Sequence, residues 1–210
     1  MKKSILSAVK ASCVLGLFFM MSCAKTGSGP DDPDGPDRDS GGAIPNSLHI
    51  AFETPDWKRQ IDCSHLDLNP TDAPDPQVVF VFASSESTRN TFMLSYPKYA
   101  GDLEKAGNIR RYPVAKYSAV AGPFQYAMKL PLDDDKLDVS YGRLESDAGD
   151  SETEFTEITE IKRVGTDGNY GVFQLKGRYG FHSTLVRSSG NEPGKYVKGT
   201  FHLKVRAQLD

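Results

Sequence analysis

The stretch that decides the fold covers residues 156–185 and reads TEITEIKRVGTDGNYGVFQLKGRYGFHSTL. Apolar and polar residues alternate along much of it, so successive side chains would point to opposite faces of a sheet. The Asp167-Gly168 pair near its middle favours a tight β-hairpin, because such turns need positive φ angles. The pattern predicts a strand ending near Val164, a turn, and a second strand starting near Val172.

The same period of two recurs along the chain after residue 47. A loop at Ser188–Gly194 is expected to lead into a last strand, GKYVKGTFHLKV, whose apolar residues share one face. The weaker pattern of Phe155, Ile158 and Ile161 predicts a register break. The other alternating or continuously apolar segments are 48–52, 78–83, 92–96, 124–130 and 137–141.

Repeated short strands with turn signals between them predict an all-β fold, a single antiparallel β-sandwich over residues 44–210. A lipocalin-like β-barrel is the alternative, since both folds give the same alternation. Only residues 99–106 favour a short helix. His49 and His202 each lie between two apolar residues of a predicted strand, which places them on the polar face and predicts that they are exposed.

The N-terminus has the pattern of a secretion signal. Lys2, Lys3 and Lys10 precede an uncharged stretch at 11–21, which is shorter than the roughly 20 residues of a membrane span. The Met-Met-Ser-Cys sequence that ends at Cys23 resembles the lipobox of bacterial lipoproteins. That resemblance implies cleavage after residue 22 and a diacylated Cys23 at the mature N-terminus.

Residues 23–43 are predicted to be the lipidated cysteine and a disordered tether, rich in Gly, Ser, Pro and Asp. The whole chain has 25 basic and 28 acidic residues, and removal of the three signal-peptide lysines leaves a net charge of −6. Such a balance gives no basic footprint for nucleic acid. Cys63 is the one cysteine left after the signal and the lipid site, so the fold is predicted to have no internal disulfide.

The hairpin at 156–185 and the G-T-F sequence at 199–201 resemble the final strands of small uncharacterised β-sandwich lipoproteins of Bacteroidetes. The resemblance covers about a quarter of the chain. It implies a β-sandwich and the outer membrane as compartment, with exposure at the cell surface as a further expectation from the acidic tether. It implies no activity.

The strongest candidate for a metal-binding or catalytic cluster is the run from Cys63 through Ser64, His65 and Leu66 to Asp67. In an extended strand Cys63, His65 and Asp67 would share a face, yet a closed metal site or a nucleophile needs further partners that the sequence does not offer. A thiol beside solvent-facing polar residues is the preferred interpretation. The aspartates 133–135 are interpreted as a turn rather than a calcium site. No catalytic set, metal site or cofactor is predicted.

Aromatic residues are the candidate ligand-binding groups, because aromatic rings stack on sugars. Trp57 lies in a loop-like segment, and Tyr96, Tyr99 and Tyr112 surround a region rich in Pro and Gly. The alternative is that these rings pack in the core. The sequence therefore predicts a lipid-anchored, non-enzymatic envelope protein that presents a binding domain to a protein partner. The second hypothesis is a glycan-binding accessory lipoprotein of an outer-membrane uptake system.

Overall fold

The computed structural model describes residues 43–87, 89–130, 142–187 and 190–209. The predicted signal peptide (1–22), Cys23 and the tether up to residue 42 lie outside the described residues. The aspartate turn at 133–135 and the strand predicted at 137–141 also lie outside them.

The described residues form eleven strands and one short helix. Their bounds are β1 (His49–Thr54), β2 (Trp57–Asp62), β3 (Thr71–Asp72), β4 (Val78–Ser84), β5 (Thr91–Pro97), α1 (Ala100–Glu104), β6 (Arg111–Tyr112), β7 (Tyr126–Leu130), β8 (Gly142–Ser146), β9 (Phe155–Asp167), β10 (Tyr170–Arg187) and β11 (Gly190–Gln208). The helix lies inside the segment 99–106 that was predicted to form one. Among the described residues no helix is both long and apolar enough to cross a membrane.

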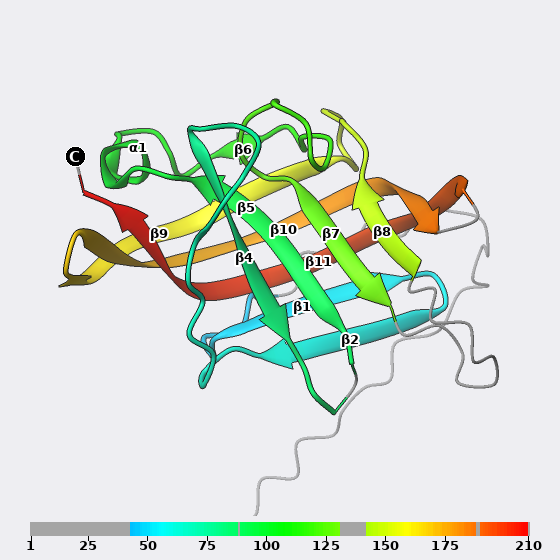
Figure 1. The fold of residues 1–210 in the computed structure, drawn as a ribbon, viewed down its shortest axis with the longest axis horizontal. Helices are drawn as coiled ribbons and strands as arrows, with labels where there is room; N and C mark the ends of the chain where they lie inside the picture. The colour runs from blue at the N-terminus through cyan, green and yellow to red at the C-terminus, as the bar shows by residue number, and fades with distance from the viewer. Residues whose placement is uncertain (1–42, 88, 131–141, 188–189, 210) are drawn as a thin grey trace, which may run out of the picture. The chain divides into compact units, whose positions relative to one another are not determined.

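The fold is all-β, as predicted, and consists of one large antiparallel sheet. Its strand order is β2-β1-β11-β10-β8-β7-β5-β4-β3, with β9 paired to β10 and β6 to β9. The strands β4, β5 and β7 cross in front of β1, β10 and β11, so the sheet covers itself as the two layers of a sandwich (Figure 1). The ends of the strand order, β2 and β3, do not pair with each other. The lipocalin-like barrel is therefore the wrong alternative, because the sheet does not close.

The long strand β10 belongs to both layers. Residues 170–180 pair with β9, whereas residues 183–186 pair with β8. A register shift between His182 and Thr184 in the pairing with β11 marks the place where β10 changes partner. Such β-bulges bend a strand and increase its twist. The bend allows the single strand β10 to continue from one layer of the sandwich into the other.

A stack of aromatic rings fills the space between the layers. The Tyr126 ring of β7 lies 4.6 Å from Tyr179 and 5.1 Å from Phe181, both of β10, measured between ring centroids. Tyr126 and Tyr179 are buried, and both hydroxyls are satisfied: Tyr126 bonds Thr156 Oγ1 at 2.6 Å, and Tyr179 donates to the carbonyl of Ala51 at 2.9 Å. Buried tyrosines need such partners, because an unpaired hydroxyl loses its hydrogen bonds to water.

The G-T-F sequence at 199–201, in the middle of β11, has a packing reason. A Cβ on Gly199 would lie 2.6 Å from the Tyr179 hydroxyl and 1.9 Å from the carbonyl oxygen of Ala51. The tyrosine therefore reaches Ala51 across a position that only glycine can occupy without a shift of the backbone.

The predicted hairpin is confirmed, with a turn one residue later than its Asp-Gly pair. Asp167 pairs with Tyr170, so Gly168 and Asn169 are the two turn residues. Gly168 has a φ of +56°, and Asn169 is not among the residues with positive φ, which is the pattern of a turn that needs glycine at its first central position. The predicted register break in β9 is also present, as two shifts in its pairing with β10.

The loop predicted at Ser188–Gly194 is wrong for most of its length. β10 continues to Arg187 and β11 begins at Gly190, with Thr184 paired to Pro193 and Arg187 to Gly190. The Gly and Pro residues suggested a loop, but pairing along two long neighbouring strands overrides these local preferences.

The exposure predicted for His49 and His202 is wrong as well. The two residues are cross-strand partners in β1 and β11, and both are buried. His49 bonds the Ser47 carbonyl at 2.7 Å and Thr200 Oγ1 at 2.9 Å. Asn46 accepts a bond from Lys176, the neighbour of His202 in β10. The chain before β1 thus reaches the outer face of the sheet beside these positions, which strand alternation alone could not reveal.

Candidate functional site

The structure distributes the four candidate aromatic residues over different elements. Tyr96 of β5 is fully buried, and its hydroxyl donates to the Arg206 carbonyl at 2.6 Å. Burial raises the pKa of Tyr96. Tyr112 of β6 donates to the Asn108 carbonyl at 2.9 Å and lies against Phe124. A buried ring such as that of Tyr96 offers no face to a sugar.

Trp57 and Tyr99 complete the candidate set but lie apart. Trp57 starts β2 and packs edge-on against Phe52, with 5.2 Å between ring centroids. Tyr99 precedes α1 and bridges to Gln208 at the end of β11. Because β2 lies on the opposite side of the fold from α1 and β6 (Figure 1), the four residues do not form one stacking platform.

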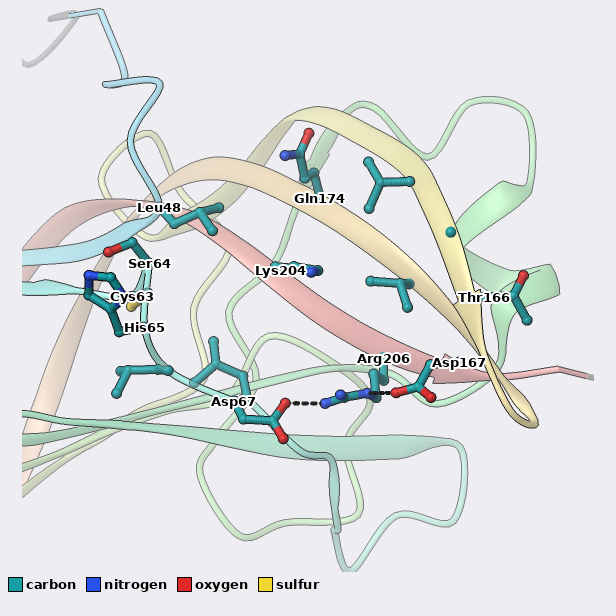
Figure 2. A pocket seen from close by; sticks show the side chains of 15 residues that line it. Leu48, Cys63, Ser64, His65, Asp67, Thr166, Asp167, Gln174, Lys204 and Arg206 are labelled. Carbon is teal, nitrogen blue, oxygen red and sulfur yellow. Dashed lines mark hydrogen bonds and ion pairs between the residues drawn. The ribbon is translucent and has the colours of Figure 1, made fainter.

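A cleft of about 760 Å³ is lined by the segment that the sequence singled out. Its floor is the outer face of β10 and β11, with Gln174 and Lys204 near its centre (Figure 2). One wall is the segment 63–68 that follows β2, and the other is the end of β9 at 164–167. The pairing of β1 with β11 stops at His202, so β1 does not run beside Lys204.

The wall at 63–68 is held by its ends. The Cys63 N–H donates to the Leu48 carbonyl at 2.9 Å, and Cys63 and Leu68 are both buried. Asp62 Oδ1 accepts the N–H of Ser64 at 2.8 Å, the local turn by which aspartate ends a strand. The segment is therefore not an extended strand, and Cys63, His65 and Asp67 do not share one face as the sequence pattern suggested.

The thiol of Cys63 is not available for chemistry. Burial raises its pKa to about 12, and the nearby Asp62 adds to the shift. The thiolate is the nucleophilic and metal-binding form, so this cysteine stays protonated and inert. In the described parts of the chain no three or more His, Cys, Asp or Glu side chains gather as a metal site.

Arg206 closes one end of the cleft through a network of acids (Figure 2). Its guanidinium donates to Asp67, to Asn69 at 2.9 Å and to Asp167 at 2.9 Å. The hydrogen bonds that Arg206 donates to Asp67 and Asp167 raise the pKa of Arg206, and the bond that Asp67 accepts from Arg206 lowers the pKa of Asp67. Arg206 thus links the two walls, since Asp67 comes from the segment after β2 and Asp167 from the end of β9.

A second candidate site is the outer edge of β4. The Ser85 N–H donates to the Asn90 carbonyl across the β4–β5 turn. Backbone groups along an antiparallel strand alternate in direction, so the N–H and C=O groups of Phe82 and Ser84 point away from β5. Among the described residues no strand pairs with β4 on that side beyond Phe80, which is paired to the two-residue strand β3.

The residues at this edge are apolar, unlike those at the other edge of the sheet. β4 reads VVFVFAS, and the Phe82 side chain is 41% exposed beside Phe80, whose ring packs against Tyr117. β2, at the opposite edge, reads WKRQID. Charged side chains protect an edge strand from pairing with other chains, whereas an apolar edge invites it.

The sequence pattern indicated β4 only as a buried strand, and nothing in it marked Lys204 or Arg206 as residues that line a cleft. The continuous apolar run at 78–83 indicates burial on both faces, but whether a strand lies at an edge depends on its pairing partners. Arg206 meets Asp67 across 139 positions of sequence, a separation that no local pattern reports.

The chain has no match among known protein families, curated proteins or solved structures.

Proposed function

We propose that this protein is a lipid-anchored component of the outer membrane whose domain binds a protein partner and catalyses no reaction. The observation that carries the proposal is the apolar edge of β4, with which no strand of the described residues pairs beyond Phe80. The partner contributes an extended segment that pairs with Phe82 and Ser84 and continues the sheet beside β3. This is the mode of recognition in which backbone hydrogen bonds supply affinity and side-chain pockets supply specificity.

Two features support an extended segment of a partner protein as the ligand of this edge. The strand β3 already pairs with Val79 and Phe80, so the geometry of the edge accepts an antiparallel neighbour. The exposed ring of Phe82 lies next to Phe80 and Tyr117 and offers an apolar contact to a side chain of the added strand.

Photo-crosslinking in cells tests the proposal. A benzophenone amino acid in place of Phe82 is expected to give one discrete adduct with a second protein, identified by mass spectrometry. Adding Ser84→Pro, which removes an outward N–H, is expected to reduce the adduct at least tenfold. The matched control is Gln60→Pro, because the Gln60 N–H also points outward, from the charged edge at β2.

The outcomes are distinct. An adduct that contains a second copy of this chain would replace the partner protein with self-association. An adduct that survives Ser84→Pro, or the absence of any adduct at position 82, would contradict strand addition at β4. Turnover by the purified protein that one point mutation abolishes would contradict the non-enzymatic role.

A further inference from the structure

Two histidines are buried on the outer face of the sheet. His49 of β1 and His202 of β11 are direct cross-strand partners, and they are 0% and 7% exposed. Their neighbours along the two strands, Ile50 and Leu203, belong to the core between the layers. Since side chains alternate along a strand, the two histidine rings lie on the opposite side of the sheet and are covered from outside the sandwich.

Residues 43–47, which lead into β1 and are called the entry segment below, lie against this pair. The Nδ1 atom of His49 donates to the Ser47 carbonyl at 2.7 Å, since a carbonyl can only accept, and the Lys176 ammonium group donates to Asn46 Oδ1 at 2.8 Å. The first bond is made at β1 and the second at β10, on the far side of β11. The entry segment therefore spans the histidine pair.

The hydrogen bonds around the pair suit neutral rings. With its proton on Nδ1, His49 can accept the Thr200 hydroxyl at Nε2, over a distance of 2.9 Å. His202 has no hydrogen-bond partner at either ring nitrogen among the described residues. A charged imidazole carries two N–H donors, so protonation of His202 would bury both donors without an acceptor, which is unfavourable.

The side chains that surround the pair add to this cost. In order across the layer, one row of cross-strand neighbours consists of Asp62 of β2, His49, His202, Lys176 of β10 and Glu160 of β9. The cation is thus the direct neighbour of His202, whereas the two acids lie at the ends of the row. Burial lowers the pKa of His49, and the nearby His202 and Lys176 lower it further.

No other charged group on this face compensates a charge on the pair. Asp62 accepts the N–H of Ser64 and lies near the titratable His65. In the adjacent rows, Arg178 of β10 is paired with Glu157 of β9, and Lys204 follows His202 two residues along β11. The entry segment reads AIPNS and has no charged side chain.

We propose that the entry segment is an acid-sensitive cover: it binds the outer face of the sheet while His49 and His202 are neutral, and protonation of the pair releases it. Release brings both rings into water, where their N–H groups find acceptors and the repulsion by Lys176 is screened. The device is independent of the β4 edge.

One consequence rests on the proposed lipid anchor. The five residues of the entry segment would join the tether on release and lengthen it by up to about 17 Å, at roughly 3.3–3.6 Å per residue. The domain would then reach farther from the membrane at acidic pH than at neutral pH.

The mobility of a spin label on the entry segment tests the proposal. A nitroxide is attached to Pro45→Cys, an exposed position, in the full chain purified in detergent with Cys13→Ser and Cys23→Ser. The buried Cys63 thiol, with its pKa raised to about 12, does not compete for the label. The label is expected to be immobilised at pH 7.5 and to gain a mobile component, reversibly, at pH 5.5.

The size of the effect follows from proton linkage. An imidazole that is neutral while covered and has an ordinary pKa of about 6.5 once released raises the ratio of released to bound segment about tenfold at pH 5.5. The ratio of mobile to immobilised label is therefore expected to rise at least tenfold between pH 7.5 and pH 5.5.

Histidine variants assign the effect to the pair. His49→Gln and His202→Gln are each expected to reduce the rise, and the double variant is expected to abolish it. His182→Gln is the matched control, because His182 is exposed and bonds Glu154, and it is expected to keep the full rise. A label on Gln60→Cys in β2 is expected to show no change with pH, which separates local release from loosening of the sheet.

Nitrogen NMR of ring-labelled histidines in the unsubstituted chain is a measurement that needs no folded variant at the pair. Two of the four rings are expected to become protonated over the pH range in which the label at position 45 becomes mobile.

Three results would overturn the proposal. They are a rise in mobility that persists in the double variant, an equal change at position 60, and a label at position 45 that stays immobilised while all four rings become protonated. None of them bears on the crosslink at Phe82.

Discussion

His49 shows how burial changes an ionisable side chain on the outer face of the sheet. Burial lowers its pKa from the ordinary value of 6.5, and the nearby His202 and Lys176 lower it further, while the bond to Ser47 opposes the shift. Asp62 is its cross-strand neighbour in β2. Below about pH 6.5 the unfolded chain therefore binds more protons than the folded one, so stability present above that pH is lost as the pH falls.

The expected result is a free energy of unfolding that decreases from pH 7.5 to pH 5, measured by urea denaturation at each pH. His49→Gln retains a hydrogen-bonding amide without a titrating ring and is expected to flatten this slope. His65→Gln, at an exposed position of the cleft wall, is the control and is expected to leave it unchanged. Equal slopes for the wild type and His49→Gln would contradict the explanation.

At the scale of elements, the β9–β10 hairpin depends on one backbone conformation. Gly168 has a φ of +56°, which costs other residues roughly 1–2 kcal/mol. Gly168→Val is therefore expected to lower the free energy of unfolding by about that amount. Gly165→Ala, three residues earlier and with no atom within 4 Å of its added Cβ, is expected to have little effect. Thermal denaturation of the wild type and both variants measures the two effects on stability.

The strands were predictable where the alternation of apolar and polar residues matches a strand with one side on the core and the other on the outside. Alternation located β1, β5 and the β9–β10 hairpin, because one side of each strand faces the aromatic core. The extension of β10 and β11 through 184–193 was not predictable, since pairing between two long strands outweighs the Gly and Pro signals there. The burial of His49 likewise depends on a chain segment that packs on the outer face.

The candidate sites were predictable in part. The segment 63–67 was recognised for its chemical groups and does form a wall of a cleft, but its chemistry differs because Cys63 is buried with the core residues. Lys204 and Arg206 gave no signal in the sequence, since isolated basic residues on the polar face of a strand are common. Their role depends on which other strands and loops surround them.

For the whole molecule, the proposed anchor is tested by metabolic labelling. Cells fed radiolabelled palmitate are expected to label the wild-type protein, because a lipobox cysteine receives acyl chains. Cys23→Ala is expected to abolish the label, and Cys13→Ala is expected to retain it. Label on Cys23→Ala, or none on the wild type, would reject Cys23 as the lipid site.

The location of the domain follows from a second treatment of the same cells. Protease added to intact cells is expected to degrade the domain if it is exposed at the surface, with a periplasmic protein as the protected control. Protection until lysis would place the domain in the periplasm and would direct the search for a partner to envelope proteins.

The shared strand β10 also determines how the molecule would carry a mechanical load. A pull that enters before β1 and leaves through a partner held at β4 would pass along the sheet from β1 to β11 and β10, then through β8, β7 and β5. The four residue pairs that join β10 to β8 form one of the shortest ladders on that path. The aromatic core between the layers would bear part of the same force. The stacked rings of Tyr126, Tyr179 and Phe181 would therefore resist separation of the two layers.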